Sequence, residues 1–160
     1  CFDDSGARFD ADGNLSNWWT DNDSEQFAVL GKKLVKQYSD VIAIDDVNLN
    51  GEFTLGENIG DLGGINAAYD GLQIFFEKNG RPEDIDGFTA EQRFFMSWGT
   101  IWRTKMRDEA LRNLIKTNEH SPGMYRAYMP LQNVESFYTA FNIVEGDKMF
   151  LKPDDRVNIW

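Results

Sequence analysis

The sequence contains one cysteine, one histidine and far fewer basic than acidic side chains. The single cysteine, Cys1, excludes an internal disulfide framework and leaves the redox compartment undecided. Only 16 Lys and Arg stand against 27 Asp and Glu, a net charge of −11, which argues against partners such as nucleic acid or an anionic membrane surface. No apolar run approaches the roughly 20 residues of a membrane helix. Because the initiator Met and a signal peptide are also missing, we expect the interior of a longer protein.

Apolar periodicity predicts a mainly α fold with few or no strands. With 160 residues, 41% of them hydrophobic, the chain amounts to one domain with a core of its own. The stretch "VIAIDDVNLNG" (41–51) reads as an extended segment followed by a loop, and the end of the chain as a loose tail. Spacings of three and four between apolar residues, with the capping pattern "TAEQ", predict helices at about 24–38, 54–78, 89–102, 108–115 and 133–142.

Two acids lie one helical turn apart in "FTLGENIGDLGG" (53–64), so Glu57 and Asp61 share a helix face. Glu57 has a purely structural explanation, because "TLGE" can form a capping box with Thr54 as the N-cap. The structural explanation of Asp61 is weaker, because Asp is a poor helix former in a helix interior. The pair is therefore a candidate for chemistry.

The same region also matches a calcium-binding loop. "DVNLNGEFTLGE" (46–57) fits the pattern D-x-[DN]-x-[DN]-G-x5-E at every defined position. The β-branched run that precedes it stands where the motif needs a helix, and only two of its ligand side chains are carboxylates, which predicts weak affinity. The oxygen ligands would come from the side chains of Asp46, Asn48, Asn50 and Glu57 and from the backbone of Glu52.

The only histidine, His120, lies in "NEHSPG", where the helical pattern breaks, and Arg126 follows six residues later. A lone histidine in a turn is commonly a solvated residue. A titratable ring and a cation on one short loop are also suited to stabilising an oxyanion. This combination is not specific by itself.

The fragments "FDDSGARFDADGNLSNWW", "GENIGDLGG" and "HSPGMYR", together with a terminal Trp, resemble the C-terminal part of the neprilysin family of zinc metallopeptidases. The resemblance extends from Phe2 to Trp160. It implies that residues 1–160 form the C-terminal part of a thermolysin-like (gluzincin) catalytic domain. It also implies an endopeptidase that hydrolyses oligopeptides within an enclosed chamber.

The resemblance assigns a role to each candidate residue. Glu57 would be the carboxylate ligand of a catalytic zinc ion, and Asp61 would accept a hydrogen bond from a zinc-binding imidazole, fixing its tautomer. His120 would hydrogen-bond the tetrahedral oxyanion, and Arg126 would hold a substrate carbonyl. In the neighbourhood of Glu57, the glycines at 63 and 64 would allow close approach of the zinc-binding helix.

Two further residues and three departures complete the resemblance. Ile101 and Trp102 match positions that line the pocket for the side chain after the scissile bond, although helix core is an equal explanation. Asn118 stands where the family usually has an Asp that orients the histidine ring, so the charge state of His120 is open. Cysteines of animal members are missing at Arg103 and in the tail "RVNIW". A bacterial member is the simplest explanation, expected in the cell envelope, the periplasm or outside the cell, with the cytoplasm as the alternative.

A catalytic zinc ion needs three protein ligands and one open position, and Glu57 is one ligand. The family's H-E-x-x-H supplies two histidines and the glutamate that activates water. We expect this motif just upstream of Cys1, in the remainder of the same polypeptide. The isolated chain should then bind zinc weakly or not at all and be inactive. A calcium-binding module and a non-catalytic pseudo-peptidase domain are the alternatives.

Overall fold

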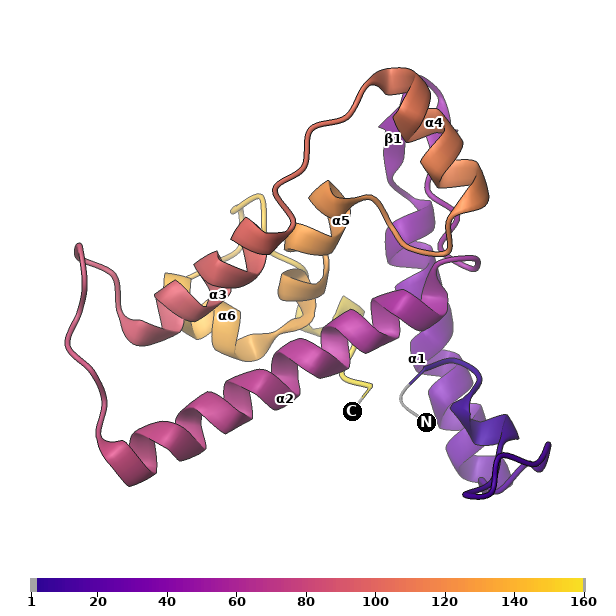
Figure 1. Ribbon diagram of the computed structural model, residues 1–160, viewed down its shortest axis with the longest axis horizontal. Coiled ribbons are helices and arrows are strands. Elements are labelled where there is room, and N and C mark those ends of the chain that lie inside the picture. The colour runs from indigo at the N-terminus through magenta and orange to yellow at the C-terminus, as the bar shows by residue number, and fades with distance from the viewer. Residues whose placement is uncertain (1–2, 160) are drawn as a thin grey trace. The chain divides into compact units, whose positions relative to one another are not determined.

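The computed structural model describes residues 3–159, and it confirms a mainly α fold (Figure 1). Cys1 lies outside the described residues, as do Phe2 and Trp160, the first and last residues of the predicted resemblance. Within the described range, no helix combines the length and the apolar character needed to cross a membrane. The α-helices are α1 (Asp21–Ser39), α2 (Leu55–Asn79), α3 (Ala90–Ile101), α4 (Asp108–Thr117), α5 (Gly123–Tyr128) and α6 (Glu135–Phe141). The 3-10 turns are Gly6–Arg8, Pro130–Asn133 and Pro153–Asp155, and the strands are β1 (Ile42–Ile44) and β2 (Val47–Asn48).

The chain divides into two compact units, and the boundary lies within α2, between Asp61 and Leu62. The first unit comprises the residues up to Asp61 together with 106–122 and Ile159. The second comprises residues 62–105 and 123–158. Glu57, Asp61 and His120 belong to the first unit, and Ile101, Trp102 and Arg126 belong to the second.

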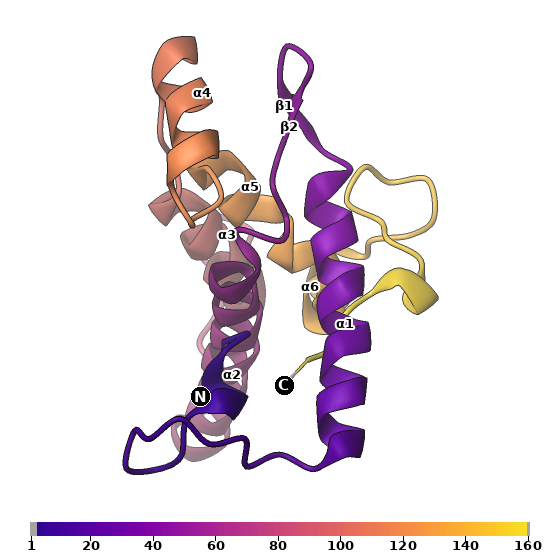
Figure 2. The ribbon, with the colours of Figure 1, turned by 90° about the vertical axis from the view of Figure 1, so that its right-hand side faces the viewer.

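In the first unit, α1 is longer than predicted because Thr20 caps it. The Thr20 hydroxyl accepts a hydrogen bond from the backbone N–H of Asp23, which satisfies one of the free donors at the helix start. The predicted extended segment forms the antiparallel hairpin β1–β2, which Figure 2 shows beyond the C-terminal end of α1. Arg112 of α4 donates a hydrogen bond to the carboxylate of Asp45 in the hairpin turn, at 2.7 Å. This ion pair raises the pKa of Arg112.

Gly51 is required where the chain returns from the hairpin to α1. A Cβ at this position would overlap the carbonyl oxygen of Val35 and would lie 2.7 Å from the Ser39 hydroxyl oxygen. The N–H of Gly51 donates to that same hydroxyl, at 3.2 Å. The close approach of two backbones thus explains the glycine.

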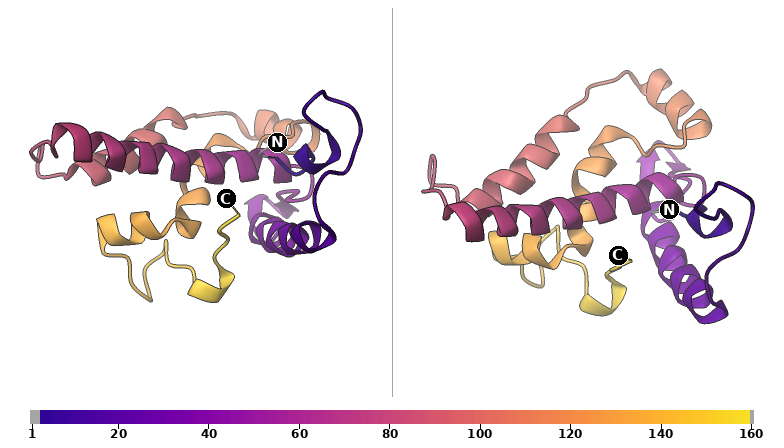
Figure 3. Two further views of the ribbon diagram at one scale, coloured as in Figure 1. Left: turned by 90° about the horizontal axis from the view of Figure 1, so that it is seen from below. Right: turned by 60° about the horizontal axis from the view of Figure 1, so that its bottom comes forward.

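In the second unit, aromatic side chains from three helices form the core. Figure 3 shows α2 as one uninterrupted helix, as predicted. The predicted capping box of α3 is confirmed, since Thr89 and Gln92 exchange backbone and side-chain hydrogen bonds. Phe95 of α3 is buried, with ring centroids 5.4 Å from both Tyr69 of α2 and Phe137 of α6.

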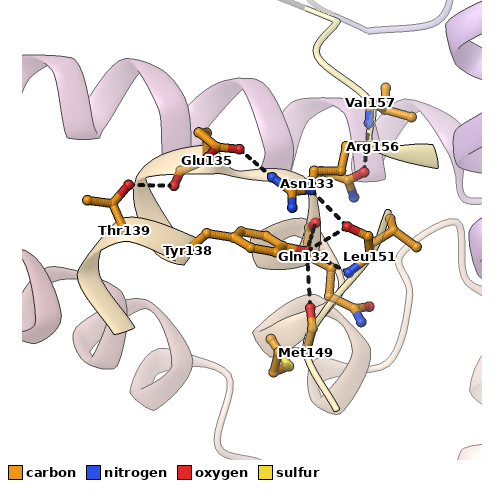
Figure 4. A network of polar contacts seen from close by, with 9 residues as sticks. All are labelled: Gln132, Asn133, Glu135, Tyr138, Thr139, Met149, Leu151, Arg156 and Val157. Carbon is orange, nitrogen blue, oxygen red and sulfur yellow. Dashed lines mark hydrogen bonds and ion pairs between the residues drawn. The ribbon is translucent and has the colours of Figure 1, made fainter. Parts of the chain in front are cut away.

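The predicted loose tail is wrong, because Tyr138 anchors it (Figure 4). The Tyr138 hydroxyl donates to the carbonyl of Gln132 at 2.8 Å and accepts a hydrogen bond from the N–H of Leu151 at 2.7 Å. The guanidinium of Arg156 lies 3.5 Å from the centre of the same ring. The hydroxyl of one buried tyrosine thereby holds the tail, which has little regular secondary structure of its own. The helix predicted over 133–142 also begins later, at Glu135, after a 3-10 turn.

Candidate functional site

The site in the first unit is built around Glu57 and His120, which are 63 residues apart in sequence. Oε2 of Glu57, in the first turn of α2, lies 2.8 Å from Nε2 of His120. Both side chains are about two-fifths exposed. Asp61, one turn further along α2, is only 7% exposed. The structure therefore brings together the predicted zinc ligand and the predicted oxyanion donor, and it buries the predicted supporting acid.

The start of α2 differs from the capping box predicted for Thr54 and Glu57. The Thr54 hydroxyl donates to the carbonyl of Asn50 at 3.0 Å and accepts a hydrogen bond from Nδ2 of Asn58 at 2.9 Å. The Glu57 carboxylate meanwhile reaches a different segment of the chain, at His120. Thr54 is thus held by residues four positions away on either side, whereas Glu57 contacts a residue that is distant in sequence.

Asn118 orients the His120 ring from within the same loop. Oδ1 of Asn118 accepts a hydrogen bond from the backbone N–H of His120 at 2.9 Å and lies 3.0 Å from Nδ1 of the ring. On the opposite edge, Nε2 faces the Glu57 carboxylate. Since both ring nitrogens face oxygen acceptors, both contacts are hydrogen bonds only when each nitrogen carries a hydrogen. The amide thus holds the Nδ1 edge of the ring, with the Nε2 edge directed at the Glu57 carboxylate.

Arg126 lies on α5, in the second unit. It contacts two tryptophans, Trp98 in α3 and Trp102 at the C-cap of α3. Its guanidinium carbon lies 3.9 Å from the centre of the Trp102 ring, and the indole N–H of Trp98 donates to its backbone carbonyl at 3.0 Å. A cation over an indole face is stabilised by the ring quadrupole. A Cβ at Gly123 would lie 2.9 Å from the carbonyl oxygen of Trp102, so the glycine of "HSPG" permits this approach.

Two tyrosines of α5 accompany Arg126. Burial raises the pKa of Tyr128, and burial together with the charge of Tyr128 raises the pKa of Tyr125. Both phenols therefore remain protonated at neutral pH, and neither adds negative charge beside Arg126 on this short helix.

The structure separates Ile101 from Trp102. Ile101 is 64% exposed and, with Trp98, borders an apolar hollow of about 210 Å³, whereas the Trp102 ring lies under Arg126. Helix core, the structural alternative, does not describe so exposed an isoleucine. Other residues that line the hollow are Ile65 and Ala68 of α2 and Phe94 of α3.

The predicted calcium loop is used for other contacts. A strand rather than a helix leads into it. Nδ2 of Asn48 donates to the carbonyl of Ser39 at 2.7 Å, and Oδ1 of Asn50 accepts from the N–H of Phe53 at 3.0 Å. With Glu57 directed to His120, these side chains do not form one coordination shell, and the geometry gives the calcium interpretation no support.

The donor set fits zinc as a partial site. Across residues 3–159, no cluster of three or more His, Cys, Asp and Glu side chains is placed to hold a metal ion. Glu57 is an accessible carboxylate, a hard oxygen donor of the kind that zinc accepts beside two imidazoles. The residues present are therefore consistent with one ligand from this chain and with others from elsewhere.

Sequence reasoning missed a buried pair next to the candidate residues in sequence. Ser121 follows His120 and donates its hydroxyl to Oδ1 of Asn58, which follows Glu57, at 2.9 Å. The sequence offers one signal for this pair, because a polar residue directly follows each candidate, in "EN" (57–58) and in "HS" (120–121). The contact of Trp98 with Arg126 was also missed, because helical periodicity places Trp98 in the core without naming its partner.

Comparisons with known proteins agree with these features. The model of peptidase family M13 matches residues 1–157. A neutral endopeptidase of Lactococcus lactis is 36% identical over 99% of this chain and 23% of its own length, and neprilysin-21 of Caenorhabditis elegans is 34% identical over 99% and 21%. A crystal structure of the zinc metalloprotease Zmp1 of Mycobacterium tuberculosis in complex with inhibitor matches this chain with a TM-score of 0.94 and 42% sequence identity. The match covers 99% of this chain and 25% of the Zmp1 chain.

The chain thus spans about a quarter of the length of the relatives that it matches. The predicted resemblance is confirmed by the family model and by the solved structure together. Motifs that were recognised one at a time in the sequence, around Glu57, His120 and Arg126, occur here in a fold shared with a zinc metalloprotease. The chain belongs to peptidase family M13, the neprilysin family.

Proposed function

We propose that this chain forms part of the catalytic domain of a zinc-dependent endopeptidase that hydrolyses oligopeptides. The observation that carries the proposal is the 2.8 Å contact between Glu57 and His120, which joins a carboxylate ligand to an imidazole donor within one compact unit. Family membership supports the reaction class, and the relatives are named as an endopeptidase and a zinc metalloprotease.

Glu57 would hold the zinc ion through its carboxylate, and Asp61 would steady a second ligand. When bound, zinc supplies Lewis-acid polarisation of the scissile carbonyl and lowers the pKa of water. Asp61 is buried one turn from Glu57, which supports the proposal that its carboxylate would accept a hydrogen bond from an imidazole of a neighbouring segment. Such a bond fixes the tautomer and orientation of that imidazole.

His120 and Arg126 would act on the substrate. The Nε2–H of His120 would donate to the oxyanion that develops during attack on the peptide carbonyl, while Asn118 holds the opposite edge of the ring. Arg126 would donate to a substrate carbonyl and so fix the peptide backbone, with Trp102 supporting its guanidinium. Ile101, beside the apolar hollow, would contact the side chain that follows the scissile bond.

The two remaining zinc ligands and the catalytic base would come from an H-E-x-x-H segment in the remainder of the same polypeptide. The parent gene should encode this motif within a few residues upstream of Cys1. Reading those codons is a direct check, and a different sequence there would contradict the proposal.

The activity test compares the full-length protein with the isolated 160 residues. The full-length protein should contain one zinc ion and hydrolyse a fluorogenic oligopeptide. A chelator should abolish hydrolysis, and added zinc should restore it. The isolated chain should show neither stoichiometric zinc nor chelator-sensitive hydrolysis. A full-length protein that folds without zinc and without activity would instead be the pseudo-peptidase.

Replacing Asp61 with alanine in the full-length protein should lower zinc affinity or activity by about 10- to 100-fold, the typical cost of losing a carboxylate that supports a metal-binding imidazole. The matched control is Asp70→Ala, which removes an exposed carboxylate from the same helix. Metal titration and steady-state kinetics measure the two effects. Equal behaviour of the two variants would remove Asp61 from the site.

A further inference from the structure

A relay of buried polar side chains involves the residues that directly follow Glu57 and His120. Ser121 donates to Oδ1 of Asn58, Asn58 donates through Nδ2 to Thr54, and Thr54 donates to the carbonyl of Asn50, with donor–acceptor distances of 2.9, 2.9 and 3.0 Å. The three side chains are only 3%, 1% and 4% exposed, in that order. Buried polar side chains are usually hydrogen-bonded in this way, because a buried group without a partner lowers the stability of the fold.

The relay joins the two segments that carry the candidate residues. Asn58 directly follows Glu57 in α2, and Ser121 directly follows His120 in its loop. In each segment one side chain is half-exposed at the site and the next is buried in the relay. The hydrogen bond between Asn58 and Ser121 therefore fixes the loop to the same helical turn that presents Glu57.

The ring of His120 is positioned in two steps. Asn118 fixes the ring relative to its own loop, through bonds to Nδ1 and to the backbone N–H. That local contact cannot set the distance from the ring to α2. The bond from Ser121 to Asn58 does so, and the buried Pro122, with its restricted φ, limits movement of the loop on the other side.

We propose that Asn58 and Ser121 are positioning residues, which hold the Nε2 edge of His120 at a fixed distance from Glu57 and thereby from the reacting carbonyl. The proposal rests on the function proposed above. Reaction rates are sensitive to this kind of placement, since a displacement of about 1 Å can cost up to about 100-fold. Asn58 is suited to the role because its amide accepts from one neighbour and donates to the other, which neither an ionised Asp nor Leu can do.

The main test is Ser121→Ala in the full-length protein. We expect kcat to fall about 10-fold on an oligopeptide substrate, with KM and zinc content unchanged within about 2-fold, because only placement of the oxyanion donor is lost. Ser121→Thr keeps the hydroxyl and should restore most of kcat. Thr139→Ala, which removes an exposed hydroxyl that bonds a backbone carbonyl of α6, is the matched control and should leave kcat unchanged.

A double-mutant cycle separates positioning from a merely structural role. In a His120→Gln background, Ser121→Ala should cost less than about 2-fold, because a residue that acts through His120 has nothing further to position. The same factor of loss in both backgrounds would overturn the proposal, as would a lowered melting temperature with unchanged kcat. Affinity for a phosphonamidate peptide, which imitates the tetrahedral oxyanion, should fall about 10-fold in Ser121→Ala, like kcat.

The outcomes distinguish this proposal from the function on which it rests. A full-length protein without zinc or activity, or one in which His120→Gln is harmless, would refute the proposed function and this inference with it. An active zinc enzyme that depends on His120 but tolerates Ser121→Ala would refute the positioning role alone. Asn58→Leu adds a second variant at the other end of the same bond, and it should reproduce the loss of kcat.

Discussion

Replacing Glu57 with glutamine is expected to abolish stoichiometric zinc and peptide hydrolysis in the full-length protein. An amide keeps the size of the side chain but loses the negative charge that binds the ion. A catalytic zinc ion has only three protein ligands, so the loss of one removes a large part of its binding. The loss of zinc affinity should exceed the roughly 10- to 100-fold that removal of a supporting residue costs. Metal analysis of the purified variant measures zinc directly, and kinetics on an oligopeptide measures the loss of activity.

The matched control is Glu52→Gln, which removes the same charge from an exposed position five residues earlier. It should retain zinc and activity. The Glu57 variant should fold normally, because the side chain is half-exposed and its substitution is isosteric, so its thermal unfolding in the presence of chelator should match that of the parent protein. If the Glu57 variant kept one zinc ion per molecule, Glu57 could not be a ligand.

The helices could be predicted because their signals are local. The spacing of Ile59, Leu62 and Ile65 marks the buried side of α2, and all three are almost completely buried. The capping box at Thr89 places the start of α3 within one residue. By contrast, α5 spans only six residues, too few for a periodic pattern, and it depends on tertiary contacts such as that of Trp98 with Arg126.

The sequence identifies which residues are candidates for the site, but it does not predict their contacts. Glu57, Asp61, His120 and Arg126 were identified from motifs, and the structure shows which of them share a compact unit. Thr54 illustrates the limit, because the local rule pairs it with Glu57 while its hydroxyl bonds Asn58 and Asn50. The partnership between Asn58 and Ser121 spans 63 residues, so it exists only once the chain has folded.

Trp98 and Trp102 also make different contacts that a local sequence pattern cannot predict. Trp98 of α3 and Trp102, the C-cap residue of α3, fit one apolar stripe, and their ring centroids lie 5.6 Å apart. One uses its N–H to bind a backbone carbonyl, and the other uses its face to support a guanidinium. Periodicity reports that a side chain is apolar and turned inward, but it cannot report which edge or face of an indole meets a partner.

Replacing His120 with glutamine should lower kcat by about 100- to 1,000-fold, the range measured when one donor to an oxyanion is removed. Glutamine can donate a neutral N–H, but it lacks the second ring nitrogen through which Asn118 orients the imidazole. A poorly oriented donor stabilises the transition state little. KM and zinc content should change little, because the donor acts on charge that develops only during the reaction.

The zinc content of this variant separates its role from that of Glu57, although the two side chains are in contact. Loss of the ligand should remove metal and activity together, whereas loss of the oxyanion donor should leave metal bound to an enzyme with low kcat. Glu119→Gln, a change at the exposed neighbouring position, controls for disturbance of the loop and should have nearly the parental kcat. If His120→Gln lost zinc, the histidine would act on the metal site; if it kept full kcat, the 2.8 Å contact with Glu57 would be structural only.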